Sequence, residues 1–430
     1  MSSGRALILY AFGEPLRRAT NRDHLFAFAR HSRLRCHYVN IAVRPIPRRL
    51  RSVDYDLVVL HTSVLAALRW PPRPPRFMRR LEPLHAMSAV KIALPQDDFL
   101  RSQPVGELLE RLRVDHVFTP VPASEWPRIY RAVDRSRTQF HPALTGYLED
   151  EEVARMERIT AQEGERRPID VGYRAWHAPP WLGRHGALKT RIAEVFAQEG
   201  PRHGLTVDIS TRDGDTKFGD EWTRFMAQCK YTIGVEGGAS IDDYDGSVRA
   251  ATDAYLAAHP DATFDEVEAA CFPGRDGELR LRALSPRHLE ACVTRTCQVL
   301  IEGHYDGVLT AGTHYLPLKA DLSNLDEVLE EMARDERRAE ITENAYRDVV
   351  ASRAWTYAAF VAQVERTVFG DAVPAAPPET SAEDRVAELG ERLSWRWVAV
   401  RSRVLMPLWL KLLGLIPRSV AERLKRMLLR

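Results

Sequence analysis

The chain has 430 residues, of which 45% are hydrophobic and 28% are charged, and its net charge is +2. This length is too great for one ordinary hydrophobic core and suits two domains of roughly 150–200 residues. The composition excludes wholesale disorder, and the near-neutral balance excludes a generally basic protein, so we expect no nucleic-acid partner. No run reaches the roughly 18–20 apolar residues of a membrane-spanning helix, and five scattered cysteines indicate reduced thiols in a cytoplasmic protein.

The first 148 residues alternate short apolar runs with helical patterns such as Arg22–Ser32 and Gly106–Arg113. The apolar runs are rich in Val, Ile, Leu or Tyr, which is typical of buried parallel strands. They are Ala6–Phe12, Cys36–Ile41, Tyr55–Leu60, Val90–Leu94 and Val114–Thr119. The alternation predicts a doubly wound, Rossmann-like α/β domain over residues 1–148.

Residues 149–370 repeat this pattern and predict a second Rossmann-like domain. Its expected strands are Ile169–Tyr173, Leu205–Ser210, Tyr231–Val235, Thr296–Ile301 and Gly307–Leu309. Residues 246–273 look like an insertion with one or two helices of its own, and two final helices are expected near Arg337–Val350 and Trp355–Val368. Because ligands of open α/β sheets bind beyond the carboxyl ends of the strands, two tandem sheets predict a cleft lined by strand-end residues.

The segment LSPRHLEACVTRT predicts a helix that begins at Ser285. Serine favours the N-cap and Pro286 suits the first helical position. The exposed N–H groups of such a helix end can hold a diphosphate, and Arg287 adds a cation in the first turn. Glu290 lies on the same helix face and could accept hydrogen bonds from a ribose diol. The alternative is an ordinary capped helix with a surface ion pair.

Other candidate residues follow predicted strands of the second domain. Arg174 and Lys189 could neutralise a pyrophosphate without a metal. The segment VEGGASIDDYDG offers Gly237 and Gly238 for close backbone approach. It also offers Ser240 and a group of carboxylates that includes Glu236, which could bind sugar hydroxyls, bind a metal ion or form only a solvated turn.

Tyr305 and His314 come from the later run GHYDGVLTAGTHYLPL and are further donor-site candidates, although packing alone would also explain them. In the first domain, His61 and Asp97 each follow a predicted strand. Both positions suit a general base on the acceptor side of a cleft, or a side chain that only satisfies backbone groups.

The order YRAW, VEGGASIDDYDG, SPRHLEACVTRT, GHYDGVL and HYLPLKADLSN resembles a bacterial family of GT-B glycosyltransferases related to the CgeB/spore-coat type. The resemblance covers about Ile169–Val328. It implies two Rossmann-like domains facing a cleft, with the last helices packing back on the first domain. It also implies Glu290 as the ribose-binding residue, Arg174 and Lys189 as the diphosphate pair, and neither a cofactor nor an essential metal.

A Pro/Ala-rich linker is expected at residues 371–386, followed by a basic amphipathic tail at residues 387–430. From Ser394 to Arg430 the tail holds nine Lys/Arg against one acid, Glu422, among many Leu and Trp residues. This combination predicts peripheral association with an anionic membrane surface, at the inner face of the cell membrane. The alternative is a helical segment that docks on the protein itself or on another subunit.

Together these features predict an enzyme that moves a sugar from a nucleotide-diphosphate sugar to a hydroxyl of a glycan or lipid-linked acceptor, in cell-surface glycan or glycolipid synthesis. A nicotinamide-dependent oxidoreductase is disfavoured because no GxGxxG motif follows a strand in either half. The remaining alternative is a membrane-associated sugar-binding or scaffold protein that has kept the fold without catalysis.

Overall fold

The computed structural model describes residues 3–16, 18–69 and 75–406. A six-stranded sheet forms the first domain, in the order β2-β1-β3-β4-β5-β6 with every pair parallel. Its strands are β1 (Arg5–Tyr10), β2 (Arg35–Asn40), β3 (Leu57–Leu60), β4 (Val90–Ala93), β5 (His116–Thr119) and β6 (Gln139–Pro142). The first five match the predicted runs, which are buried because helices cover the sheet.

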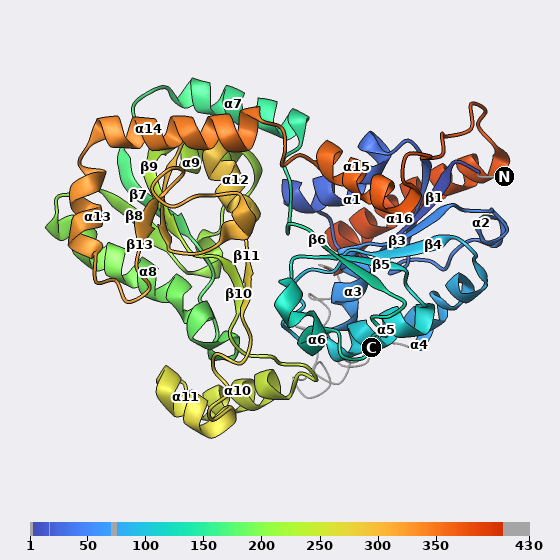
Figure 1. Ribbon diagram of the computed structural model, residues 1–430, viewed down its shortest axis with the longest axis horizontal. Coiled ribbons are helices and arrows are strands. Elements are labelled where there is room, and N and C mark those ends of the chain that lie inside the picture. Colours follow the sequence, from blue (N-terminus) through green and yellow to red (C-terminus); the bar gives the residue numbers. More distant parts are fainter. Residues whose placement is uncertain (1–2, 17, 70–74, 407–430) are drawn as a thin grey trace.

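Helices α1 (Ala19–His31), α3 (Thr62–Leu68) and α5 (Gln103–Leu112) connect these strands. Shorter helices are α2 (Arg48–Arg51), α4 (Pro75–Arg79) and α6 (Trp126–Ile129). Apolar side chains from both faces of the sheet form two cores, one of which includes residues of the much later helix α15 (Tyr357–Phe369). The chain therefore returns to its first domain after completing the second (Figure 1).

The second domain has a five-stranded parallel sheet in the order β13-β12-β9-β7-β8. Its strands are β7 (Ile169–Arg174), β8 (Val207–Ser210), β9 (Cys229–Gly234), β12 (Cys297–Ile301) and β13 (Leu316–Leu318). A separate antiparallel pair joins β10 (Gly237–Ala239) to β11 (Leu281–Ala283). The surrounding helices are α7 (Asp150–Glu163), α8 (Gly183–Arg202), α9 (Gly219–Gln228), α12 (Pro286–Val293), α13 (Leu325–Met332) and α14 (Asp335–Ala345).

The predicted strand Gly307–Leu309 is wrong. Tyr305, Asp306 and Gly307 have φ angles of +46°, +52° and +73°, and this left-handed backbone cannot begin an extended strand. The sheet edge is instead β13, where Pro317 lies in an edge strand that has one free side.

The predicted insertion forms α10 (Ser247–Ala258) and α11 (Phe264–Cys271). Figure 1 shows these two helices below the second domain, at the end of the β10–β11 pair. The two Rossmann-like sheets lie side by side, as in the GT-B fold. This confirms the predicted fold class.

The last described helix, α16 (Ala382–Val400), begins with a Ser381–Asp384 capping box and lies against the first domain. The Trp395 ring stacks on Tyr10 with 5.7 Å between centroids, and the Tyr10 hydroxyl donates to Glu391 at 2.8 Å. Within the described ranges, every helix is too short or too polar to cross a bilayer. Residues 407–430 of the predicted tail lie outside those ranges.

Candidate functional site

A cleft of about 900 Å³ lies between the two sheets and is lined by residues of both domains. Its walls include residues that directly follow strands, such as Ala11 after β1, His61 after β3 and Val235 after β9. This is the position at which open α/β sheets bind their ligands.

The N-terminus of α12 opens into this cleft. Ser285 has the extended backbone of an N-cap (φ −89°, ψ 143°), yet its hydroxyl makes no capping hydrogen bond. Pro286 has no N–H, and the His288 N–H donates to the Ser285 carbonyl at 2.9 Å, so the Arg287 N–H and the positive helix end remain available to an anion. The Arg287 side chain is held at the same end, because its Nη1 donates to the Arg174 carbonyl at 2.8 Å.

Lys189 of α8 lines the cleft as a cation without an anionic partner. It makes no hydrogen bond or ion pair with any residue that the structure describes. Burial and, to a smaller extent, the nearby Arg287 together lower its pKa to about 8, and Asp97 opposes the shift. An anionic ligand would raise this pKa, so the site favours a negatively charged group.

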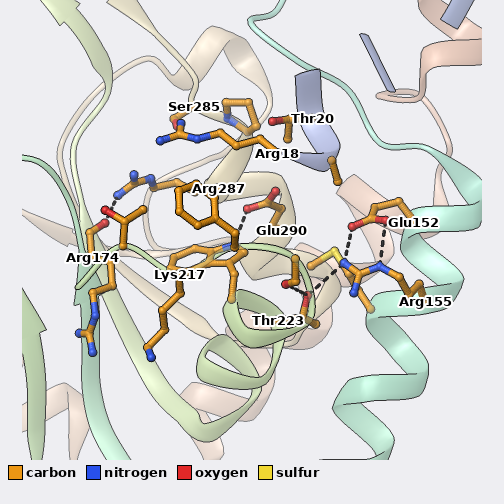
Figure 2. Close-up of a pocket in the computed structure, with 17 residues that line it drawn as sticks. Arg18, Thr20, Glu152, Arg155, Arg174, Lys217, Thr223, Ser285, Arg287 and Glu290 are labelled. Atoms are coloured by element: carbon orange, nitrogen blue, oxygen red, sulfur yellow. Dashed lines mark hydrogen bonds and ion pairs between the residues drawn. The ribbon is translucent and has the colours of Figure 1, made fainter. Parts of the chain in front are cut away.

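The first domain contributes a second helix end, which the sequence analysis missed. Helix α1 follows Arg18, has no side-chain cap and carries no acid in its first turn. Arg18 and Thr20 line the same region as Ser285 and Arg287 (Figure 2). Two helix N-termini without side-chain caps thus converge from opposite domains on one region whose positive charge favours an anion.

A smaller pocket of about 140 Å³ adjoins this region. Ser285 and Arg287 line both cavities, whereas Glu290 lines only the smaller one. The Glu290 carboxylate accepts a hydrogen bond from Trp222 Nε1 at 2.8 Å, and burial raises its pKa. Figure 2 shows Glu290 between Arg287 and the Glu152–Arg155 pair.

The guanidinium group of Arg174 is turned away from the α12 N-terminus (Figure 2). Its Nη2 pairs with Asp208 at 2.8 Å, and the group lies over the Phe225 ring at 4.3 Å. Arg174 therefore lines both cavities, and its backbone carbonyl positions Arg287 by accepting a hydrogen bond from that side chain.

Gly237 and Gly238 line the cleft from β10. Gly238 has a φ of +116°, and a Cβ atom there would lie 2.2 Å from the Leu281 carbonyl oxygen. The strand pairing with β11 itself therefore requires glycine at this position.

Four other predicted donor-site residues do not line either cavity. The Glu236 carboxylate accepts from the Tyr305 N–H at 2.7 Å, and the Tyr305 hydroxyl donates to the Ile301 carbonyl. Ser240 donates to Asp276 at 2.7 Å, and His314 bonds the Thr310 N–H and Asp348. Their contacts hold loops of the second domain in place.

The acidic run after β10 joins the two domains. Asp242 pairs with Arg131 at 3.2 Å, and the Arg131 guanidinium lies 3.5 Å from the centroid of Tyr244. The Asp243 carbonyl accepts from the Arg101 N–H at 2.7 Å, while its carboxylate caps α10. Over the described residues, no group of three His, Cys, Asp or Glu side chains could hold a metal ion.

On the first-domain wall, Asp97 and His61 both line the cleft. Asp97 is exposed and has a φ of +54°. His61 is buried, and both of its ring nitrogens are hydrogen-bonded, Nδ1 to Ser63 and Nε2 to Nδ1 of His24 at 2.9 Å. His24, from α1, also lines the cleft and was not predicted.

No protein-family model matches the chain, and no curated protein matches it in sequence. Among solved structures, it is similar to Anabaena HepE in complex with UDP, with 11% identity and a TM-score of 0.47 over 85% of this chain and 99% of that one. It is also similar to the T4 phage β-glucosyltransferase in complex with UDP-glucose, with 10% identity and a TM-score of 0.45 over 84% and 98%. A third similar structure is AviGT4, a glycosyltransferase involved in avilamycin A biosynthesis, with 11% identity and a TM-score of 0.43 over 85% and 97%.

Proposed function

We propose that this chain is a glycosyltransferase that moves a sugar from a nucleotide-diphosphate sugar to an acceptor hydroxyl. The observation that carries the proposal is Lys189, an unpaired cation in a cleft where the N-termini of α12 and α1 converge. Such a region suits a diphosphate, which needs positive charge and backbone N–H donors.

The donor's orientation follows from the two adjoining cavities. The diphosphate lies at the shared wall formed by Ser285, Arg287 and Arg18. The nucleoside occupies the smaller pocket, where Glu290 accepts hydrogen bonds from the ribose hydroxyls. The sugar then extends past Gly237 and Gly238 into the larger cleft.

The chemistry needs stabilisation of the leaving diphosphate as the bond from the sugar carbon to the phosphate oxygen breaks. Fixed positive charge and helix ends supply this stabilisation in a partly dry site. Arg287 and Lys189 are the side chains placed for it, and the proposed reaction uses no metal ion.

Asp97 is the proposed base if the reaction inverts the anomeric centre. It is exposed in the cleft on the acceptor side and acts electrostatically on Lys189 from the opposite domain. His61 suits this role less well, because both of its nitrogens already have hydrogen-bond partners. In a retaining reaction no such base is needed.

The proposed setting is cell-surface glycan or glycolipid synthesis at the inner face of the membrane, as the CgeB-like resemblance suggests. Support comes from the outer face of α16, where an apolar stripe is 46–59% exposed. It consists of Leu389, Leu393, Trp397 and Val400. Arg396 and Arg403 lie along the same segment and Arg392 pairs there with Glu388, so this face combines apolar area with a net positive charge.

Calorimetric titration with a panel of nucleoside diphosphates in EDTA tests the donor site. We expect one base to bind, with affinity lost in Arg287→Ala and kept in Arg202→Ala, a matched change at an exposed arginine that lines neither cavity. Absence of binding by every base in wild-type protein would contradict the proposal. Binding that needs Mg²⁺ or Mn²⁺ would contradict the metal-free site.

A further inference from the structure

A pair of buried histidines lies on the first-domain wall of the cleft. His24 from α1 and His61 at the N-cap of α3 are 7% and 2% exposed. Nδ1 of His24 lies 2.9 Å from Nε2 of His61, so one ring must donate a hydrogen bond to the other. Which ring donates is determined by the other groups that surround the pair.

The proton positions follow from Ser63. Its backbone N–H can only donate, and it points at Nδ1 of His61 at 3.1 Å. The Ser63 hydroxyl already accepts from the Ala11 N–H at 2.9 Å, and it donates to the same nitrogen at 2.8 Å. Nδ1 of His61 is therefore unprotonated, and a neutral His61 carries its proton on Nε2.

The same reasoning fixes the second ring. Since Nε2–H of His61 donates to Nδ1 of His24, a neutral His24 carries its proton on its own Nε2. Both rings are neutral at pH 7, because burial lowers the pKa of His24 to about 4 and that of His61 well below its usual value. The pair thus presents an N–H donor rather than a base.

This N–H has no partner in the described parts of the chain, although His24 lines the cleft. His24 is 7% exposed and lines the cleft, so a ligand oxygen can accept a hydrogen bond from this N–H in place of water. Of the cations that suit phosphate, Lys189 and Arg287 belong to the opposite domain, and Arg18 lies at the start of α1, six residues before His24. The neutral donor on the first-domain wall suits an uncharged oxygen instead.

We propose that His24 binds the acceptor substrate of the sugar transfer. Its Nε2–H donates a hydrogen bond to a hydroxyl oxygen of that substrate. This inference rests on the proposed transferase function and adds the residue that recognises the acceptor. His61 then acts as a positioning residue that holds the His24 ring and its proton. On the same wall of the cleft, the exposed Asp97 can accept a proton from the attacking hydroxyl.

Histidine-selective ¹⁵N NMR tests the proton positions without turnover. The His24→Gln and His61→Gln variants assign the two rings among the 14 histidines. At pH 7 we expect a protonated Nε2 and an unprotonated Nδ1 on both rings. An unprotonated Nε2 on His24 would overturn the inference, because that ring would then be an acceptor.

Two probes then separate the possible sources of the oxygen. Methyl β-glucoside at high concentration offers only hydroxyl oxygens, whereas UDP adds phosphate oxygens. We expect the glucoside, and not UDP alone, to shift the His24 Nε2 signal. A shift with UDP alone, or with neither probe, would overturn the assignment. Because these signals need no donor turnover, failure of the transferase proposal remains distinguishable.

The transfer rates of two His24 variants provide a further test. His24→Gln keeps an N–H near the position of Nε2, whereas His24→Leu removes it. With membrane extract as the acceptor, we expect His24→Gln to keep the initial transfer rate within about threefold and His24→Leu to lower it about tenfold. A loss of about 100-fold in the transfer rate of both variants would identify His24 as a base and refute its role as a hydrogen-bond donor to the acceptor.

Discussion

Replacing Lys189 with methionine should make the protein more stable and at the same time weaken donor binding. Burial lowers the pKa of Lys189 from 10.5 to about 8, and each pKa unit corresponds to about 1.4 kcal/mol. The charged form therefore costs the folded state up to about 3 kcal/mol at pH 7, and about 1–2 kcal/mol after screening by solvent at this half-buried side chain. Lys189→Met should gain that amount in urea unfolding.

The gain in stability should depend on pH. Because the folded-state pKa is lowered, the unfolded chain binds more protons between about pH 8 and pH 10.5, and wild-type stability rises over that window. The difference between Lys189→Met and wild type should therefore shrink above pH 8. A constant difference from pH 7 to pH 10 would refute the burial argument.

The loss in donor binding comes from the missing ion pair. A charge pair at about 4 Å is worth about 4 kcal/mol at an effective dielectric of about 20. Solvation reduces this energy to about 2–3 kcal/mol. We therefore expect kcat/KM for the donor to fall about 30- to 100-fold. In wild type, kcat/KM should fall above about pH 8 as Lys189 deprotonates. Lys189→Arg should remove this alkaline limb. A Lys189→Met variant that is less stable and fully active would refute the assignment.

Three further outcomes are expected. Asp97→Asn should lower kcat about 100-fold or more with an unchanged KM for the donor, as for loss of a general base; steady-state kinetics with unchanged kcat would remove it from the mechanism. Glu290→Ala should raise the donor KM about tenfold and abolish discrimination against the 2′-deoxy donor; retained discrimination would exclude ribose binding. The Leu393→Glu and Trp397→Glu changes on the exposed face of α16 should abolish co-sedimentation with anionic phosphatidylglycerol vesicles. The matched control is Ala197→Glu, which adds the same charge at an exposed position of α8. Unchanged sedimentation of the α16 variants would contradict membrane association.

The buried strands of both sheets are predictable because a short, continuous apolar run between turn residues is typical of a buried parallel strand. The strands missed in the two main sheets are edge strands, and the short β10–β11 pair was missed as well. β6 (QFHP) and β13 (LPL) each contain a proline, which argues against a central strand and is tolerated at an edge where one side of the ladder is free. Gly307–Leu309 resembled a strand by composition, whereas the left-handed backbone at Tyr305 and Asp306 depends on its packing.

Within the site, position along the chain indicated Lys189, Ser285 and Arg287, because each lies near a strand end or a helix start. The structural role of Glu236 could not be predicted in the same way, because the Tyr305 N–H that its carboxylate binds lies 69 residues later in the chain. His24 was missed for a related reason. Nothing in the pattern of α1 shows that its inner face reaches the cleft, and the partner that fixes its proton comes from another helix.

The most direct test of the central claim is release of nucleoside diphosphate from a panel of intact nucleotide sugars, measured by mass spectrometry in EDTA with membrane extract as the acceptor source. We expect that one donor is consumed, that its sugar appears on an extract component, and that Lys189→Met slows the reaction about 30- to 100-fold. If a nucleotide sugar binds and none is consumed, the chain is a sugar-binding or scaffold protein with this fold, and the transferase proposal is contradicted.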